Sequence, residues 1–349
     1  EIMPSLVGSE MCIRDRINVA GSGSAFECWY GGKERQTQPT YHTMETCVTF
    51  TWMQLCNRLL QMTGNSLYAD YMETAIYNAL MASLKADASQ IAKYSPLEGW
   101  RHEGEEQCGM HINCCNANGP RAFAMIPQFA YQVQDDCVRV NFYAPSEAEL
   151  VLPDKKPVRL KQTTDYPRTD QIEIEVDPAK ETAFTIALRI PAWSKIAVVS
   201  VNGQPQDGVL QGAYLPVNRK WKKGDRITVK LDLRARLVER NQAQAIVRGP
   251  IVLARDSRFG DGFVDEASVV VSKDGYVELT PVKAPGFAWL AFTAPMVLGT
   301  DLESNRAPKQ IHFCDFASAG NTWDKTQRYR VWLPKTLNVM HSPYRPYNQ

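Results

Sequence analysis

The spacing of hydrophobic residues changes along this chain, and the change limits the folds that are open to it. In the first part, apolar residues recur at three- and four-residue steps, as they do on one face of an α-helix. After about Gln134 the spacing falls to two, and short runs such as CVRVNFY and QIEIEVD stand between Pro, Gly and Asp residues. This pattern predicts a multidomain α + β protein, with helices first and antiparallel strands after them.

Three helices are expected before the strands. The segments Val48–Met62 and Leu67–Leu84 both have the helical period, and Gly64 is expected to end the first of them. The third helix is expected to begin near Asn118 or the following glycine, with Pro120 in its first turn. Helical hairpins of this kind favour part of a helical barrel over residues 17–132.

The strands that follow are short and regularly spaced. They recur about every 8 to 12 residues, which is typical of a β-sandwich. Turns are expected at Asn202-Gly203 and at Asp274-Gly275. We therefore expect an antiparallel β-sandwich over residues 133–255, a second β unit over residues 256–338, and a tail at residues 339–349.

The first residues do not fit this organisation. The stretch PSLVGSEMCIRDR resembles a translated sequencing adaptor, so residues 1–16 are interpreted as a non-native segment, and Cys12 is set aside with it. On this interpretation the natural chain begins upstream and the sequence is a C-terminal fragment. Because the native start is missing, both a cytoplasmic and an exported protein stay open.

Composition excludes several classes of partner. The chain has 349 residues, 44% of them hydrophobic and 22% charged, with a formal net charge of +1. A balanced charge lacks the electrostatic footprint that nucleic acid or an anionic membrane requires. No apolar run approaches the roughly 18 residues of a membrane span. We expect neither nucleic acid nor a membrane span, and a homodimer stays open.

The nine cysteines are unevenly placed, because eight of them precede residue 140. A disulfide framework would not cluster in this way. The neighbours Cys114 and Cys115 also bridge poorly to each other, since a disulfide prefers Cα atoms about 5.5 to 6 Å apart and one trans peptide spans about 3.8 Å. Metal binding or catalysis is therefore the better interpretation of the cluster.

Two short motifs could bring ligands to one point. Glu45 and Cys47 are two residues apart, so in extended chain before the first helix both side chains would face the same way. Cys114 and Cys115 precede another expected helix, where the positive end of the helix dipole favours thiolate over thiol. If the four residues converge, we expect their ligand atoms to lie within roughly 4 Å of one another.

Three thiolates and one carboxylate suit a tetrahedral zinc ion. Cys108 and His111 are rival ligands on the same reasoning. The spacing alone also leaves open a buried, redox-inert cysteine cluster and a redox pair. Asn118 and Arg121 are expected to cap or brace the third helix.

Several motifs together carry a family resemblance. The segments SAFECWYGG, ETC before a helix, YSPLEG and CC followed by Asn and Pro resemble glycoside hydrolase family 127, the β-L-arabinofuranosidase family. The later segments LRIPAW, VNG, RKWKKGD and VRGPIVLA resemble the same family in the same order, so the resemblance covers about residues 20 to 334. It implies that the helical part is the C-terminal portion of an (α/α)6 barrel.

The resemblance also implies a role for each site residue. The zinc ligands would be Glu45, Cys47, Cys114 and Cys115. Cys114 would also be the nucleophile of a retaining hydrolase, Glu27 its general acid/base, and Tyr94 a substrate contact. The substrate would be a plant-derived oligosaccharide or glycan carrying L-arabinofuranosyl or a related plant-wall sugar.

The motifs leave a second interpretation open. A non-catalytic carbohydrate-binding or structural module could carry a structural zinc site of the same four ligands. The presence of Glu27 upstream of the ligands, where the resemblance implies a general acid/base, favours the enzyme. Because earlier barrel helices would carry much of the pocket, we expect this fragment alone to be inactive.

Overall fold

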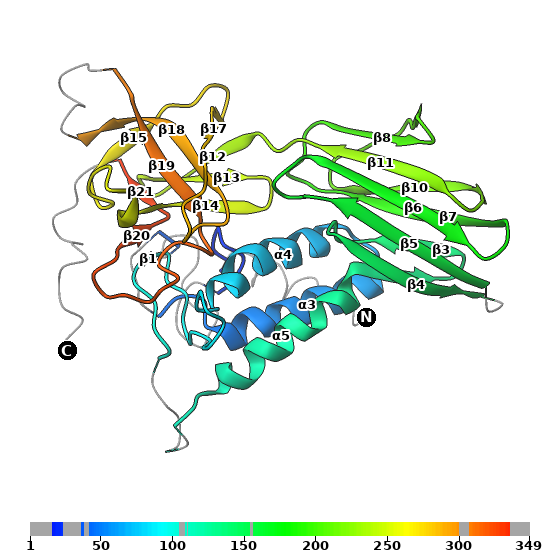
Figure 1. The fold of residues 1–349 in the computed structure, drawn as a ribbon, viewed down its shortest axis with the longest axis horizontal. Helices are drawn as coiled ribbons and strands as arrows, with labels where there is room; N and C mark the ends of the chain where they lie inside the picture. The colour runs from blue at the N-terminus through cyan, green and yellow to red at the C-terminus, as the bar shows by residue number, and fades with distance from the viewer. Residues whose placement is uncertain are drawn as a thin grey trace. The chain divides into compact units, whose positions relative to one another are not determined.

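A computed structural model describes residues 16–23, 36–37, 42–104, 109, 111–153, 156–299 and 307–335 of the chain. The chain divides into two compact units (Figure 1). The first unit combines Glu1–Met53, Thr74–Phe123 and Arg234–Gln349, and the second combines Gln54–Glu73 and Ala124–Leu233. Each unit is therefore assembled from segments that are distant in the sequence.

The helices are α3 (Thr46–Thr63), α4 (Leu67–Ala75), the π-helix η1 (Ile76–Leu80) and α5 (Cys114–Ala130). Helix α3 confirms the first expected helix. Gly64 ends it with a φ of +67°, a conformation that glycine adopts without strain, and its N–H donates to the Leu60 carbonyl at 2.8 Å. No helix in the described part of the chain is both long and apolar enough to cross a membrane.

The second expected helix is interrupted by the π-helix. Asn78, in the middle of η1, is fully buried, and its Nδ2 donates to the carbonyls of Thr74 at 2.7 Å and Pro250 at 2.8 Å. Its Oδ1 accepts the N–H of Val252 at 2.8 Å. These bonds satisfy both polar atoms of a fully buried amide, as burial requires. Through Asn78, η1 is therefore hydrogen-bonded to the start of β14 (Ile251–Asp256) in the sheet of the first unit.

Helix α5 begins earlier than the sequence analysis expected. Its first residue is Cys114, because the Asn113 side chain accepts the N–H of Cys115 at 3.0 Å. The Asn116 side chain in turn accepts the N–H of Asn113 at 2.9 Å. This reciprocal cap satisfies free N–H groups at the helix start. The expected start near Asn118 is therefore wrong, and Pro120 lies inside the helix, where it leaves one backbone acceptor without its N–H.

The second unit contains two sheets. Their strands are β2 (Tyr131–Gln134), β3 (Cys137–Val140), β4 (Ser146–Leu152), β5 (Lys156–Thr164), β6 (Gln171–Pro178), β7 (Thr182–Ile190), β8 (Ala197–Val201), β9 (Gln204–Pro205), β10 (Ala213–Trp221) and β11 (Asp225–Leu231). One sheet has the order β4-β5-β6-β11-β8-β9 and the other β10-β7-β3-β2. All pairs are antiparallel except β3 with β7. The alternation predicted for β6 is observed, since Ile172, Ile174 and Val176 are all fully buried.

The first unit contains an 11-stranded sheet. Its strands are β1 (Glu98–Gly99), β12 (Ala235–Arg240), β13 (Ala243–Arg248), β14 (Ile251–Asp256), β15 (Ser268–Val270), β16 (Tyr276–Val277), β17 (Thr280–Pro281), β18 (Ala291–Leu298), β19 (Lys309–Asp315), β20 (Tyr329–Arg330) and β21 (Leu333–Pro334). Its main path is β15-β18-β19-β14-β13-β12-β16. The expected turn at Asp274-Gly275 is present, with φ values of +53° and +78°.

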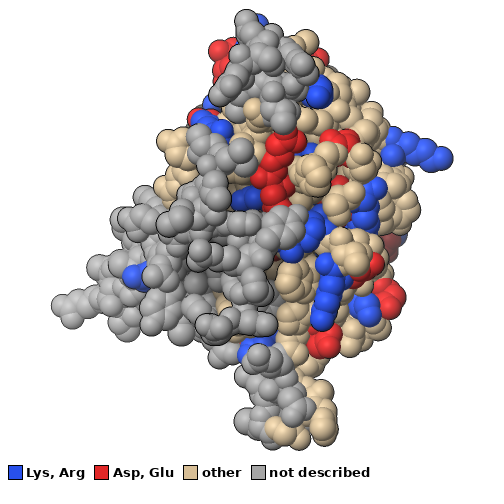
Figure 2. Space-filling model, turned by 90° about the vertical axis from the view of Figure 1, so that its left-hand side faces the viewer, with Lys and Arg blue, Asp and Glu red and all other residues tan. Residues whose placement is uncertain are grey.

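Charged side chains are mixed on the surface that can be seen. Figure 2 shows Lys and Arg interspersed with Asp and Glu over the described part of one face. That arrangement agrees with the formal net charge of +1 for the whole chain.

Candidate metal centre

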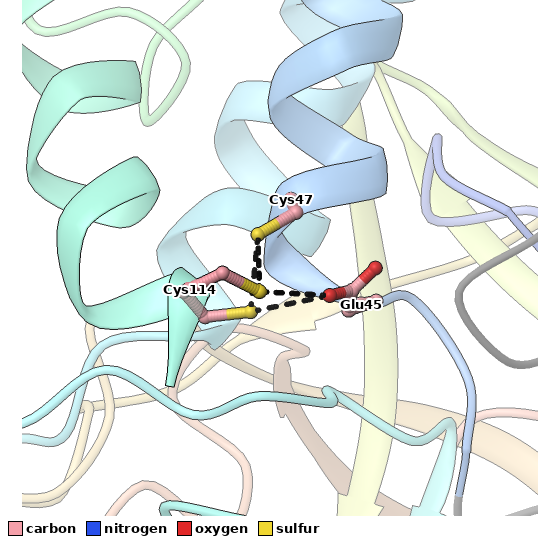
Figure 3. Close-up of side chains that lie close together, drawn as sticks. Glu45, Cys47 and Cys114 are labelled. Atoms are coloured by element: carbon pink, nitrogen blue, oxygen red, sulfur yellow. Dashed lines mark hydrogen bonds between the residues drawn. The ribbon is translucent and has the colours of Figure 1, made fainter. Parts of the chain in front are cut away.

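Two helix starts meet at the cysteine cluster. Cys47 is the second residue of α3, Cys114 is the first residue of α5 and Cys115 the second, while Glu45 immediately precedes α3. Figure 3 shows the labelled side chains of Glu45, Cys47 and Cys114 pointing toward one another. All four residues belong to the first unit. The structure therefore brings together the four residues that the motifs singled out.

The local backbone differs from the extended chain expected at Glu45. The carbonyl of Glu45 accepts the N–H of Thr49 at 2.9 Å, so the helix already begins at Thr46 and contains Cys47. The expectation of an extended Glu45–Cys47 segment is wrong at Cys47. The two side chains converge nevertheless, because a residue just before a helix and the second residue inside it can face the same side of the first turn.

The ligand atoms lie close together. Cys47 Sγ is 3.1 Å from Cys114 Sγ and 3.5 Å from Cys115 Sγ. Glu45 Oε1 is 3.5 Å from Cys114 Sγ and 3.6 Å from Cys115 Sγ. All four ligand atoms lie within 4.8 Å of one another, slightly wider than the expected distance.

The loop that contains Ala92, Lys93 and Tyr94 contacts the cluster through its backbone. The carbonyl of Lys93 accepts the N–H of Thr46 at 2.9 Å and lies 3.8 Å from Cys115 Sγ. The Thr46 hydroxyl donates to the Ala92 carbonyl at 2.7 Å. Tyr94 pairs with Glu45 in an isolated antiparallel β-bridge. These contacts fix the start of α3 against the loop that carries Tyr94.

Tyr94 itself is buried, with 5% of its surface exposed. Its ring packs edge-on against His42 at a centroid distance of 4.9 Å, and the Lys93 ammonium lies 5.4 Å from the ring centroid. The backbone of Tyr94 therefore lies next to Glu45 of the cluster, whereas its ring packs against His42 and Lys93.

Burial differs among the four ligands. Cys115 is fully buried and Glu45 is 3% exposed, whereas Cys47 is partly exposed and Cys114 is exposed. The group therefore has a buried side and an accessible side, and Cys114 carries the accessible sulfur.

The three thiols of the cluster differ in the direction of their pKa shifts. The pKa of the Cys47 thiol is lowered to about 5, chiefly because Cys115 donates a hydrogen bond to its sulfur. Burial raises the pKa of Cys114 to about 12, and the adjacent Cys47 adds to the rise. The pKa of Cys115 is also raised, first by its hydrogen bond to Cys47 and then by burial.

Of the three thiols, Cys47 therefore has the lowered pKa, while the pKa values of its two neighbours are raised. The expectation that the helix dipole favours thiolates at Cys114 and Cys115 stays a prediction for the metal-bound cluster. Neighbouring sulfurs beside a carboxylate cannot all ionise without a cation, because each charge opposes the next. Binding a dication would release the remaining protons.

The donor set fits a metal ion. Sulfurs bound at about 2.3 Å to a tetrahedral ion would lie about 3.8 Å apart, and the observed sulfur–sulfur distances of 3.1 and 3.5 Å are slightly shorter. Thiolates with one carboxylate favour a soft or borderline ion over magnesium or calcium. The group of four can therefore hold a metal ion with small movements of its side chains.

Other residues considered from the sequence lie elsewhere. Glu27 and Cys108 fall outside the described residues. His111 is exposed and does not belong to the group of four. Within the described residues, this is the one group of three or more His, Cys, Asp or Glu side chains that could hold a metal ion.

Sequence reasoning missed one contact of the cluster. Asn118 Nδ2 donates to Cys47 Sγ at 3.1 Å, although we expected this residue to cap or brace the helix. The signal was present in the spacing, because Asn118 follows Cys114 by four residues and so lies on the same face of α5.

Comparison with known proteins places the chain among the glycoside hydrolases. Residues 10–128 match a family model described as the catalytic domain of GH127 β-L-arabinofuranosidase, and residues 137–233 match the GH127 middle domain. The chain belongs to glycoside hydrolase family 127.

A curated relative and solved structures agree with this family. A non-reducing end β-L-arabinofuranosidase of Bifidobacterium longum subsp. longum is 26% identical over 235 residues, covering 60% of this chain and 34% of that protein. A GH127 β-L-arabinofuranosidase structure from Geobacillus stearothermophilus T6 has a TM-score of 0.76 at 21% identity, covering 92% of this chain and 55% of the other. A second GH127 β-arabinofuranosidase structure has a TM-score of 0.75 at 23% identity, with coverages of 94% and 55%. The chain thus spans about a third of the curated relative and about half of each solved structure.

Proposed function

We propose that the intact protein is a retaining glycoside hydrolase that releases L-arabinofuranosyl residues, or a related plant-wall sugar, from plant-derived glycans. Zinc would be held by Glu45, Cys47, Cys114 and Cys115, and Cys114 would be the nucleophile. Family membership and the names of the relatives support the class of reaction.

One observation carries the mechanism. Among the three sulfurs of the cluster, Cys114 is the exposed one, while Cys115 is fully buried and Cys47 accepts a hydrogen bond from Asn118. A ligand group that is wholly structural has no need to present a sulfur to solvent, whereas a nucleophile must reach the anomeric carbon. The accessible sulfur therefore supports catalysis at Cys114.

The residues divide the reaction into two steps. The sulfur of Cys114 attacks the anomeric carbon while the protonated Glu27 carboxyl gives its proton to the leaving oxygen. Water then attacks the same carbon, Glu27 takes a proton from that water, and the carbon–sulfur bond breaks. Bound zinc would supply a thiolate at neutral pH and make the sulfur a better leaving group. Two inversions at one carbon give net retention.

The remaining parts of the proposal concern the pocket and the scaffold. Tyr94 would contact the sugar from the loop beside Glu45. Helices α3, α4 and α5 would be the C-terminal part of an (α/α)6 barrel, and the two sheets of the second unit would form a β-sandwich. Because the chain spans about half of each solved structure, this fragment alone would be inactive.

Covalent labelling tests the nucleophile directly. A cysteine-directed electrophile shaped like β-L-arabinofuranose would be incubated with the full-length protein, and the labelled residue located by peptide mass spectrometry. We expect one label per chain on Cys114, which free L-arabinose prevents. Cys137, a partly exposed cysteine of the second unit, is the internal control and should stay unmodified.

Two outcomes would contradict the proposal in different ways. Equal labelling of Cys114 and Cys137 would show chemical exposure instead of a sugar-directed nucleophile. Tight zinc binding without label and without hydrolysis of any glycan would favour the alternative, a non-catalytic carbohydrate-binding or structural module whose zinc site is structural.

A further inference from the structure

Asn118 belongs to the second turn of α5 and contacts both α3 and its own helix. Its Nδ2 donates to Cys47 Sγ of α3 at 3.1 Å, and its Oδ1 accepts from Arg121 Nη1 of α5 at 3.1 Å. The Arg121 guanidinium carbon lies 5.3 Å from the centroid of the Phe50 ring, which is buried on α3. The two α5 side chains therefore span the contact between the helices.

The arginine determines which way the amide points. A guanidinium can only donate hydrogen bonds, so the atom of Asn118 that faces Arg121 must be the oxygen. The amide nitrogen then faces the sulfur of Cys47, and a flipped amide would place two donors against each other on one side. The Asn118 orientation is thus fixed by chemistry on both sides.

The helical spacing places these residues on the facing sides of the two helices. Cys114, Asn118 and Arg121 are separated by four and three residues, so they lie along one face of α5. On α3, Phe50 follows Cys47 by three residues and lies on the same face. The amide of Asn118 on α5 therefore faces the sulfur of Cys47 on α3. One turn further along, the guanidinium of Arg121 faces the ring of Phe50.

Because of the Asn118 contact, each of the three sulfurs has a different environment. Cys47 receives an N–H from outside the group of four, Cys115 is buried beside the Lys93 carbonyl, and Cys114 is exposed. An N–H donor directed at a sulfur fixes its rotamer and withdraws electron density from it. A sulfur held in this way is a better permanent ligand than nucleophile.

We propose that Asn118, oriented by Arg121, is a positioning residue that holds Cys47 as a permanent metal ligand and thereby leaves Cys114 as the reactive sulfur. This inference rests on the proposed metal centre. It assigns the pair a role in the chemistry of the cluster beyond bracing the helix.

Cobalt(II) binding to the chain tests the inference without requiring catalysis. Cobalt bound by thiolates gives a sulfur-to-metal charge-transfer band, and competition with a chelator gives the affinity. Asn118→Leu keeps the size of the side chain but removes the donor, and Asn118→Asp places an acceptor against the sulfur. Arg121→Met removes the residue that orients the amide. Gln128→Leu, at an exposed position of the same helix, is the matched control.

We expect a graded response. Asn118→Leu should weaken cobalt binding by about 10- to 100-fold and shift the charge-transfer band, which is the usual effect of removing a group that orients a ligand. Asn118→Asp should weaken binding further, and Arg121→Met should produce a smaller change in the same direction. Gln128→Leu should leave both affinity and spectrum unchanged, and all metal-free variants should melt close to the wild type.

The outcomes separate this inference from the proposed function. If the wild type binds cobalt and Asn118→Leu binds it within about twofold with the same spectrum, the positioning role is wrong and the metal centre stands. If the wild type gives no thiolate band, both are wrong. Should Asn118→Leu fail to fold, Arg121→Met decides, because wild-type affinity and spectrum in that variant would contradict the oriented amide.

Discussion

The sulfur of Cys47 lies 3.1 Å from the sulfur of Cys114, across 67 positions of sequence. Each of these cysteines lies in the first turn of a long helix, so the two sulfurs mark the point where the starts of α3 and α5 approach each other. Any ion bound there would link the two helix starts directly. The stability of the chain should therefore report on the cluster.

Metal removal provides the first prediction. Stripping zinc with a chelator should lower the melting temperature, because an ion that binds only the folded state stabilises it by about 2.7 kcal/mol at a free concentration 100 times its Kd. Zinc and cadmium should restore the melting temperature, whereas magnesium should not. Calorimetry or circular dichroism would measure the shift.

The control for this experiment is a variant with a broken ligand set. Cys115→Ser removes the buried sulfur, and its melting temperature should respond little to zinc. A wild type that melts at one temperature with and without zinc would show that the four residues do not form a metal site.

The second prediction concerns Cys114. In the full-length protein, Cys114→Ser should lower kcat on an aryl β-L-arabinofuranoside by about 10³-fold or more, because loss of a nucleophile removes the covalent route. A serine hydroxyl is much less acidic than a thiol and replaces neither the ligand nor the nucleophile. Cys137→Ser, outside the cluster, should retain wild-type kcat. Turnover by Cys114→Ser at the wild-type rate would exclude the thiolate mechanism.

The third prediction concerns Glu27, which lies outside the described residues. Glu27→Gln should lower kcat by roughly 10² to 10⁴-fold on substrates with poor leaving groups, since these need protonation by a general acid. The loss of kcat should be much smaller on activated aryl glycosides, because their leaving groups depart as stable anions without being protonated. The zinc content of Glu27→Gln, measured by atomic spectroscopy, should equal that of the wild type. Loss of zinc from this variant would indicate that Glu27 is a metal ligand instead of the general acid.

The change of hydrophobic period located the main transition of the fold well. Helix α5 ends at Ala130 and β2 begins at Tyr131, close to the predicted change of structure. The predicted helix over Val48–Met62 and the turn at Asp274-Gly275 were also found, because both depend on local signals. Periodicity and turn residues act over a few neighbours and are readable from one sequence.

The features that the sequence did not predict depend on which side chain reaches which partner. Asn113 and Asn118 are both acceptable helix caps, and only the three-dimensional contacts show that Asn113 caps α5 while Asn118 reaches Cys47. The order of ionisation among the sulfurs likewise depends on their distances from one another and from Glu45. Residue types could suggest a ligand set, but they could not rank its thiols.

The last prediction concerns a buried ion pair of the second unit. Arg189 on β7 is fully buried and forms ion pairs with Asp70 and, at 2.6 Å, with Glu73 on α4. Glu73→Ala should lower the free energy of unfolding by about 3 to 5 kcal/mol, because it leaves a buried charge partly uncompensated. Urea unfolding would measure the change. Glu173→Ala, which breaks the exposed pair with Arg226, is the matched control, and it should cost about 0 to 1 kcal/mol. Equal effects of the two substitutions would mean that burial of Arg189 does not make this ion pair important for stability.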